Sequence, residues 1–119
     1  MAQLDYFERK LDDKNRLTMP VEVRSEFDGE VVLTRGFKNY IHLYTKQVWD
    51  EQVEPRLKGD ILSEEVADLN VQFRMGKSTQ KMDSKQGRIT IDKHLLEYAG
   101  ISKDVQAVRA GNYWRLMRK

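Results

Sequence analysis

Apolar and polar residues alternate over short stretches of this chain, and helical spacing is confined to a few segments. Two stretches run apolar, polar, apolar, which is typical of half-buried strands: Leu17-Thr18-Met19 and Ile89-Thr90-Ile91. Further apolar stretches predict one more pair of strands in each half of the chain, at 31–33 with 40–44 and at 105–108 with 113–117. The pattern therefore predicts an α+β protein that is mainly β.

A polar turn precedes each alternating strand, Asp-Asp-Lys-Asn at 12–15 and Ser-Lys-Gln-Gly at 84–87. Gly87 adopts a positive φ freely, and Asn15 is the best non-glycine substitute for such a position. The segments before the turns, 6–11 and 78–82, are expected to be partner strands. Each motif would then form the tip of a β-hairpin.

Short helices are expected after both motifs. Pro20 can begin one over 21–27, because a first-turn proline loses no hydrogen bond. Its counterpart spans 93–99 and is closed by Gly100.

The middle of the chain predicts two further helices. Thr45 is placed to cap the first, which Pro55 should break, and Ser63 to cap the second, which ends before Gly76. We expect these helices to connect the two β halves. Because the large apolar side chains of Trp49 and Phe73 need to be covered from water, these two helices would also offer a surface for self-association.

The two β halves repeat one unit. Aligning Arg16 with Arg88 also pairs Thr18 with Thr90, and downstream Arg35 matches Arg109 and Asn39-Tyr40 matches Asn112-Tyr113. Two copies suit a pseudo-twofold domain in which each half covers the apolar face of the other, since a solenoid usually needs three or more copies. The expected organisation is one compact unit, with a first repeat at 1–47, a helical connector at 48–76 and a second repeat at 77–119.

Charge follows the same division. Residues 46–68 hold seven acids against three bases, a net of −4, so the rest of the chain, with a total of +2, carries +6. The acidic middle is interpreted as a solvated face. The basic flanks coincide with the repeated motif.

Several classes of function are not expected. The chain has no cysteine, which excludes disulfides, thiol catalysis and cysteine-ligated zinc. His42 and His94 have no metal-ligand partner at useful spacing, and Gly76-Lys77-Ser78 lacks the earlier glycine of a phosphate loop because position 71 is Val71. We expect no enzyme activity, cofactor, metal or small-molecule substrate. No apolar run exceeds three residues and the N-terminus is not a signal peptide, so a cytoplasmic protein without membrane contact is expected.

The doubled motif carries a resemblance. Each turn ends in the same pattern: Gly or Asn, then Arg, an aliphatic residue, Thr and another aliphatic residue. A short helix and a hairpin follow each time. This arrangement resembles the AbrB-type swapped-hairpin domain. Two fused copies with a helical connector resemble the MraZ family of bacterial transcriptional regulators. LDDKNRLTMP at 11–20 is similar to the first motif of that family, and KQGRITI at 85–91 to its second. Two positions depart from the family pattern, Asn15 in place of glycine and Asp92 in place of proline.

The resemblance implies a pseudo-twofold, double AbrB-like swapped-hairpin β-barrel with short helices. It also implies a sequence-specific, nucleoid-associated transcription factor that regulates the division and cell-wall gene cluster. Its partners would be double-stranded DNA with direct repeats in the promoter and further copies of itself in a ring-like homo-oligomer. By motif position, the DNA-binding residues would be Lys14, Arg16, Lys85 and Arg88. Arginine can contact guanine through two hydrogen bonds, and neighbouring lysines can hold phosphates.

Alternatives remain for several residues. Arg35 and Arg109 recur in both halves, which favours a role in preserving the fold. Asp12 and Asp13 are typical turn-forming residues, and they could also orient Lys14. The aromatic residues are expected in the core or an interface, namely Tyr40, Trp49, Tyr113 and Trp114. For the whole chain, the alternative is an AbrB-type antitoxin or other protein-binding module. The doubled motif and a sequence ending at Lys119 make this alternative the less favoured expectation.

Overall fold

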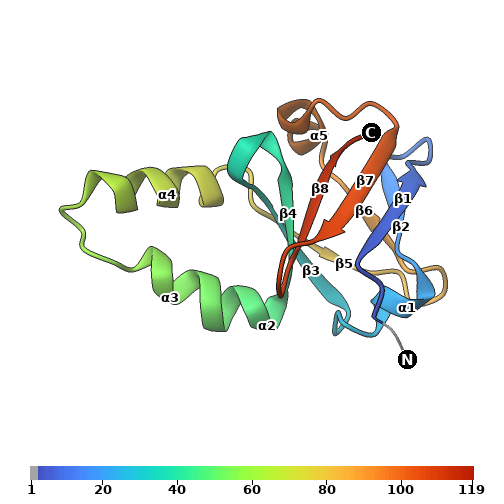
Figure 1. Cartoon of the computed structure of the whole chain (residues 1–119), viewed down its shortest axis with the longest axis horizontal. Helices are drawn as coiled ribbons and strands as arrows, with labels where there is room; N and C mark the ends of the chain where they lie inside the picture. Colours follow the sequence, from blue (N-terminus) through green and yellow to red (C-terminus); the bar gives the residue numbers. More distant parts are fainter. Residues whose placement is uncertain (1–2) are drawn as a thin grey trace.

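A computed structural model describes residues 3–119 (Figure 1). Its strands are β1 (Tyr6–Lys10), β2 (Arg16–Thr18), β3 (Glu30–Arg35), β4 (Ile41–Thr45), β5 (Ser78–Lys81), β6 (Arg88–Thr90), β7 (Asp104–Arg109) and β8 (Trp114–Arg118). Its helices are α1 (Val21–Arg24), the 3-10 turn η1 (Phe37–Asn39), α2 (Lys46–Val48), the π-helical η2 (Trp49–Val53), α3 (Glu54–Leu57), α4 (Glu64–Arg74) and α5 (Lys93–Ala99). None of the helices in this part of the chain is long and apolar enough to cross a membrane. The α+β class with mostly antiparallel strands is confirmed.

The strands form two separate sheets. The larger has six strands in the order β1-β7-β8-β4-β3-β5, and the smaller is a ribbon of β2 and β6. Because β1 and β5 are edges of an open sheet, the expected closed barrel is not observed. Three-residue strands such as β2 and β6 are too short to bridge the two edges, so closure by hydrogen bonds is not reached.

Pairing between strands crosses from one half of the chain to the other. β1 pairs with β7, β5 with β3, β2 with β6, and β4 with β8, all antiparallel. The expectation that 6–11 and 78–82 pair with the strands after their own turns is therefore wrong. A turn signal fixes where the chain reverses, but the strand partner is chosen by the apolar face that must be covered, and here that face lies in the other half.

The core lies where the two halves meet. Leu17 faces Ile89 across the ribbon, and both side chains are buried. They join a single cluster with β-sheet residues such as Leu33, Leu43 and Leu116. Each half contributes apolar residues to this cluster, so the two halves share one core.

The helices after the motifs begin in the same way despite different residues. Pro20 has φ −57° and ψ 147°, and Asp92 has φ −61° and ψ 144°. Asp92 therefore accepts the backbone conformation that proline supplies in the first half. Helix α5 ends as expected at Gly100, in the left-handed region, whereas α1 stops at Arg24 and not at Phe27, since only single turns follow it.

The connector is a helical arm that extends away from the sheets (Figure 1). Thr45 and Ser63 cap its helices as expected, by accepting hydrogen bonds from the backbone N–H groups of Val48 and Val66. Pro55 does not break the first helix, which continues to Leu57. The wider π-helical turn Trp49–Val53 lies immediately before it and places the proline in the first turn of α3, where its missing N–H costs little.

A second apolar cluster joins the arm to the sheet. Trp49 and Phe73 are 2% and 5% exposed and pack with Val32, Tyr44 and Leu57. The expectation that these two aromatic side chains need covering by another molecule is therefore wrong, because the chain covers them itself. The apolar side chains that remain exposed on the arm are Ile61, Leu62, Leu69, Val71 and Met75.

Candidate nucleic-acid interface

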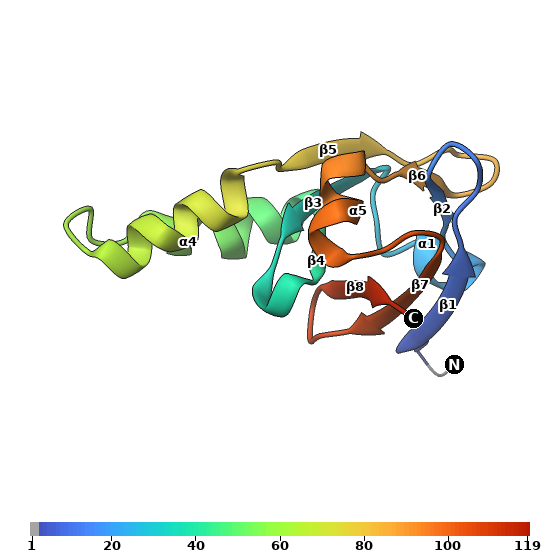
Figure 2. The same cartoon turned by 90° about the horizontal axis from the view of Figure 1, so that it is seen from above.

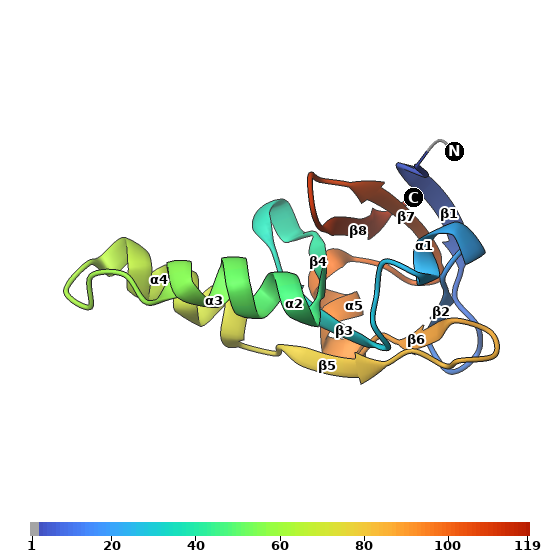
Figure 3. The ribbon, with the colours of Figure 1, turned by 90° about the horizontal axis from the view of Figure 1, so that it is seen from below.

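The ribbon of β2 and β6 brings the two motifs together. Leu17 and Ile89 point into the core, so the alternation of strand side chains places Arg16, Thr18, Arg88 and Thr90 on the opposite, outward face. Arg16 lies opposite Thr90, and Arg88 opposite Thr18, which makes the two arginines diagonal neighbours. Figures 2 and 3 show the ribbon and both turns at the end of the molecule farthest from the arm.

The first turn is organised by Asp12. Its Oδ1 accepts hydrogen bonds from the backbone N–H groups of Lys14 (2.9 Å) and Arg16 (2.8 Å), and its Oδ2 accepts from Arg16 Nε at 2.6 Å. The backbone N–H of Arg16, and then its guanidinium, hold the pKa of the Asp12 carboxyl below its usual range. No hydrogen bond among the described residues engages either Nη of Arg16. Its terminal fork is therefore available to a ligand.

The second turn is organised by Asp83 in a similar way, but the hydrogen bonds to its arginine differ. Asp83 Oδ1 accepts from the backbone N–H of Lys85 at 2.9 Å, while Oδ2 accepts from both Nε (3.2 Å) and Nη2 (2.9 Å) of Arg88. The backbone N–H of Lys85, and then the Arg88 guanidinium, lower the pKa of Asp83. Arg88 is thus held through Nε and Nη2, so one of its Nη groups is occupied, whereas both Nη groups of Arg16 are left open.

The shared hydrogen bonds define which positions are equivalent. Lys14 and Lys85 are both second after the organising aspartate, and both are exposed. The second turn therefore holds one residue more before its arginine, and Gln86 is the addition. Aligning the two arginines without a gap would pair Lys14 with Gln86 and miss this correspondence.

Backbone hydrogen bonds tie the two turns to one another. Met19 N–H donates to Gly87 O at 2.8 Å, and Ile91 N–H donates to Asn15 O at 2.9 Å. Asn15 has φ +58° and Gly87 φ +64°, as the turn compositions predict. Since each turn is bonded to the strand of the other half, the four predicted residues sit on one connected unit.

The other repeated arginines make internal contacts. Arg109 forms two hydrogen bonds to Glu26, at 2.8 and 2.7 Å, and lies over the Trp114 ring, so a role in preserving the fold is favoured for it. Arg35 lies over the ring of Tyr98. Trp49 and Trp114 are buried, and Tyr40 and Tyr113 half-buried.

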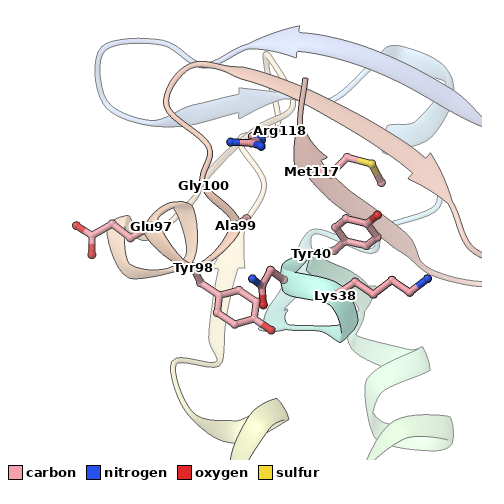
Figure 4. Close-up of a pocket in the computed structure, with 9 residues that line it drawn as sticks. Lys38, Tyr40, Glu97, Tyr98, Ala99, Gly100, Met117 and Arg118 are labelled. Carbon is pink, nitrogen blue, oxygen red and sulfur yellow. The ribbon is translucent and has the colours of Figure 1, made fainter.

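A polar cavity of about 500 Å³ lies elsewhere, between η1, the end of α5 and β8 (Figure 4). Lys38, Glu97 and Arg118 contribute its charges. The hydroxyl of Tyr98, at its wall, donates to Gly36 O at 2.6 Å. None of the four predicted site residues lines it, and within residues 3–119 no cluster of His, Cys, Asp or Glu has the form of a metal site.

The fold and the site define a duplicated, mainly antiparallel α+β protein whose two basic turns share one ribbon. Residues 5–66 match the family model described as "MraZ protein, putative antitoxin-like". The chain is 34% identical over 103 residues to the transcriptional regulator MraZ of Clavibacter michiganensis subsp. michiganensis, which covers 87% of this chain and 71% of that protein. It is 32% identical to the MraZ regulator of Kineococcus radiotolerans, over 86% of this chain and 71% of that one. The chain belongs to the MraZ family.

Proposed function

We propose that the protein is a transcriptional regulator that binds double-stranded DNA in a sequence-specific manner through the β2–β6 ribbon. One observation carries this proposal: Arg16 and Arg88 lie on the same outward face, flanked by the exposed Lys14 and Lys85. The names of the curated relatives, all transcriptional regulators, support it.

The ribbon has the dimensions that the chemistry needs, because the major groove of B-DNA admits a two-stranded β-ribbon. The open fork of Arg16 can donate two parallel hydrogen bonds to O6 and N7 of a guanine, which is worth roughly 1–3 kcal/mol of discrimination. Lys14 and Lys85 can hold phosphates and fix the register of the ribbon on the duplex. Asp12 and Asp83 would orient the arginines without contacting DNA.

The crossed pairing of β1 with β7 and β5 with β3 supports an AbrB-like swapped arrangement of two repeats. In this proposal residues 1–47 form the first repeat, 48–76 the connector and 77–119 the second repeat, and the strands intertwine without closing a barrel. The ribbon would then be the element that both repeats build jointly.

Self-association into a ring-like homo-oligomer would let several ribbons engage direct repeats in a promoter. Ile61 and Leu62 at the end of the arm are each 90% exposed, and Val71 is 60% exposed. Apolar side chains this exposed favour a protein contact. Several subunits on spaced sites raise affinity through effective concentration without new contacts. Light scattering that gives a single subunit at all concentrations would contradict this part.

The proposed target is the division and cell-wall gene cluster. The proposed location is the cytoplasm, where the protein would associate with the nucleoid. Both follow from the family and not from a contact in the molecule. The neighbouring genes test the target: a methyltransferase and cell-division genes directly downstream are expected, and an unrelated neighbourhood would argue for another target.

An antitoxin-like role is the second candidate, because the description of the matching family includes the words "antitoxin-like". Purification from the source organism separates the two. An antitoxin should bring down a small partner protein in constant ratio, whereas the regulator should elute as a homo-oligomer with or without DNA.

Selection of bound duplexes from a random DNA library tests the proposal directly. A regulator should enrich one short motif, repeated at fixed spacing where several subunits bind. Recovery of unenriched sequence with binding that is insensitive to salt would overturn the proposal.

A further inference from the structure

We propose that Arg24 is a fifth DNA-contacting residue, which serves the second turn only and holds a phosphate of the backbone. This inference rests on the proposed function. The repeated motif ends before Arg24, so alignment of the two motifs does not point to it.

Arg24 belongs to α1 of the first half, but its guanidinium lies against the turn of the second half. A Cβ built on Gly87 would lie 2.1 Å from Arg24 Nε and 2.8 Å from Cζ. Gly87 is buried and directly precedes Arg88 in the sequence. The missing side chain at position 87 therefore creates the space in which the guanidinium sits, against the residue that directly precedes Arg88 of the proposed interface.

Within the described residues, the guanidinium is anchored at one atom. Arg24 Nε donates to the backbone oxygen of Met19 at 2.8 Å. Across residues 3–119, no hydrogen bond engages Nη1 or Nη2 of Arg24, and no carboxylate forms an ion pair with it. An arginine has five N–H donors in a fixed fork, and four of the five are left for an acceptor outside the chain. A phosphate matches both the charge and the planar geometry of that fork.

The other half has no such cation. The position that corresponds to Arg24 after α5 begins is Leu96, which is buried. Asn15 stands where Gly87 stands, so the first turn carries a side chain at this position. A contact through Arg24 would therefore act at one turn of the ribbon only. Packing alone needs no charge, since Leu96 at the matching position is an apolar core residue.

Arg24→Gln separates the charged fork from the structural hydrogen bond. The amide nitrogen of glutamine lies the same number of bonds from Cα as Nε of arginine, so it can still donate to Met19 O, while the charge and both Nη groups are lost. Arg56→Met is the matched control, because it removes an exposed arginine from the arm. The probe is a fluorescein-labelled duplex of mixed sequence, titrated by anisotropy at several KCl concentrations, with thermal melting of each variant alongside.

Wild-type protein and Arg56→Met should give the same slope of log affinity against log salt. Arg24→Gln should keep its melting temperature and reduce the slope by about 0.9 for each subunit on the duplex. An unchanged slope in a folded Arg24→Gln protein overturns the inference and leaves the proposed function standing. Failure of the wild-type protein to bind any duplex overturns both. If Arg24→Gln does not fold, Arg24→Met is measured instead, and loss of the fold in both variants would assign Arg24 to the structure and overturn its role at DNA.

Discussion

In both turns at the ribbon an aspartate holds an arginine, but the two arginines differ in how many of their N–H groups are left for a ligand. In the first turn, Asp12 holds Arg16 through Nε and leaves both Nη groups open, whereas in the second Asp83 holds Arg88 through Nε and Nη2. The second turn is one residue longer and has Arg24 packed against its glycine. Under the proposed function, the first turn offers the freer arginine to a base, and the second turn adds Arg24 for the DNA backbone.

The two halves also differ where β4 meets β8, because His42 stands on the strand of the first half and Arg115 on that of the second. This difference gives the largest expected effect on stability. His42 faces Arg115 in the register. His42 is buried; its Nε2 accepts from Phe37 N–H and its Nδ1 bonds the hydroxyl of Tyr44 at 2.8 Å. Burial, and then the nearby Arg115, lower the pKa of His42 to about 4.

Stability should consequently fall as the solution becomes acidic. The unfolded chain takes up a proton on His42 near pH 6.5, but the folded chain does not until about pH 4. Between these values the free energy of unfolding should drop by about 1.4 kcal/mol per pH unit, or roughly 3 kcal/mol in all. Denaturant unfolding across this range checks it. His42→Gln should flatten the dependence above pH 5, His94→Gln should retain it, and equal curves for these two variants would contradict the assignment.

The second prediction compares the left-handed residues of the two turns. Gly87→Ala should destabilise the protein by about 2 kcal/mol, because an L side chain is strained at φ +64° and its Cβ would meet Arg24. Asn15→Ala should cost only about 1 kcal/mol, since the first turn already accommodates a Cβ. Thermal melting of both variants measures the difference. An equal loss would mean that the contact with Arg24 adds nothing to the strain.

Local features of this fold could be predicted from the sequence and its long-range partners could not. Positive φ at Asn15 and Gly87, the caps at Thr45 and Ser63 and the end of α5 all depend on a few neighbouring residues. The pairing of β1 with β7 depends on which apolar face remains uncovered, and that is settled only when both halves are assembled.

The same distinction applies to the candidate site. The motif spacing predicts Lys14, Arg16, Lys85 and Arg88, and the ribbon brings them together, although their contact with DNA stays a prediction. The motif spacing does not point to the proposed Arg24, because its proximity to Gly87 is a contact between the two halves. A useful signal was present in the sequence: Gly87 and Asn15 differ at equivalent positions, and so do Arg24 and Leu96.

A smaller effect is expected from the lysines, and it should be the same in both turns. Lys14 and Lys85 are exposed and placed by identical backbone bonds to Asp12 and Asp83. Lys14→Ala and Lys85→Ala should each lower the salt slope of DNA binding by about 0.9 per contacting subunit and weaken selected and mixed-sequence duplexes alike. Lys58→Ala, on the arm, is the control. A loss confined to the selected sequence would make these residues base readers.

The most direct test of base reading at the ribbon compares Arg16→Ala with Arg88→Ala. Binding is measured on the selected duplex and on a scrambled one at a single salt concentration, with melting as the control. Arg16→Ala should lose roughly 1–3 kcal/mol per contacted base on the selected duplex only, Arg88→Ala should lose less, and both should stay within about 0.5 kcal/mol of wild-type stability. If Arg16→Ala still prefers the selected duplex as the wild-type protein does, Arg16 does not read a base and the proposed mechanism is wrong.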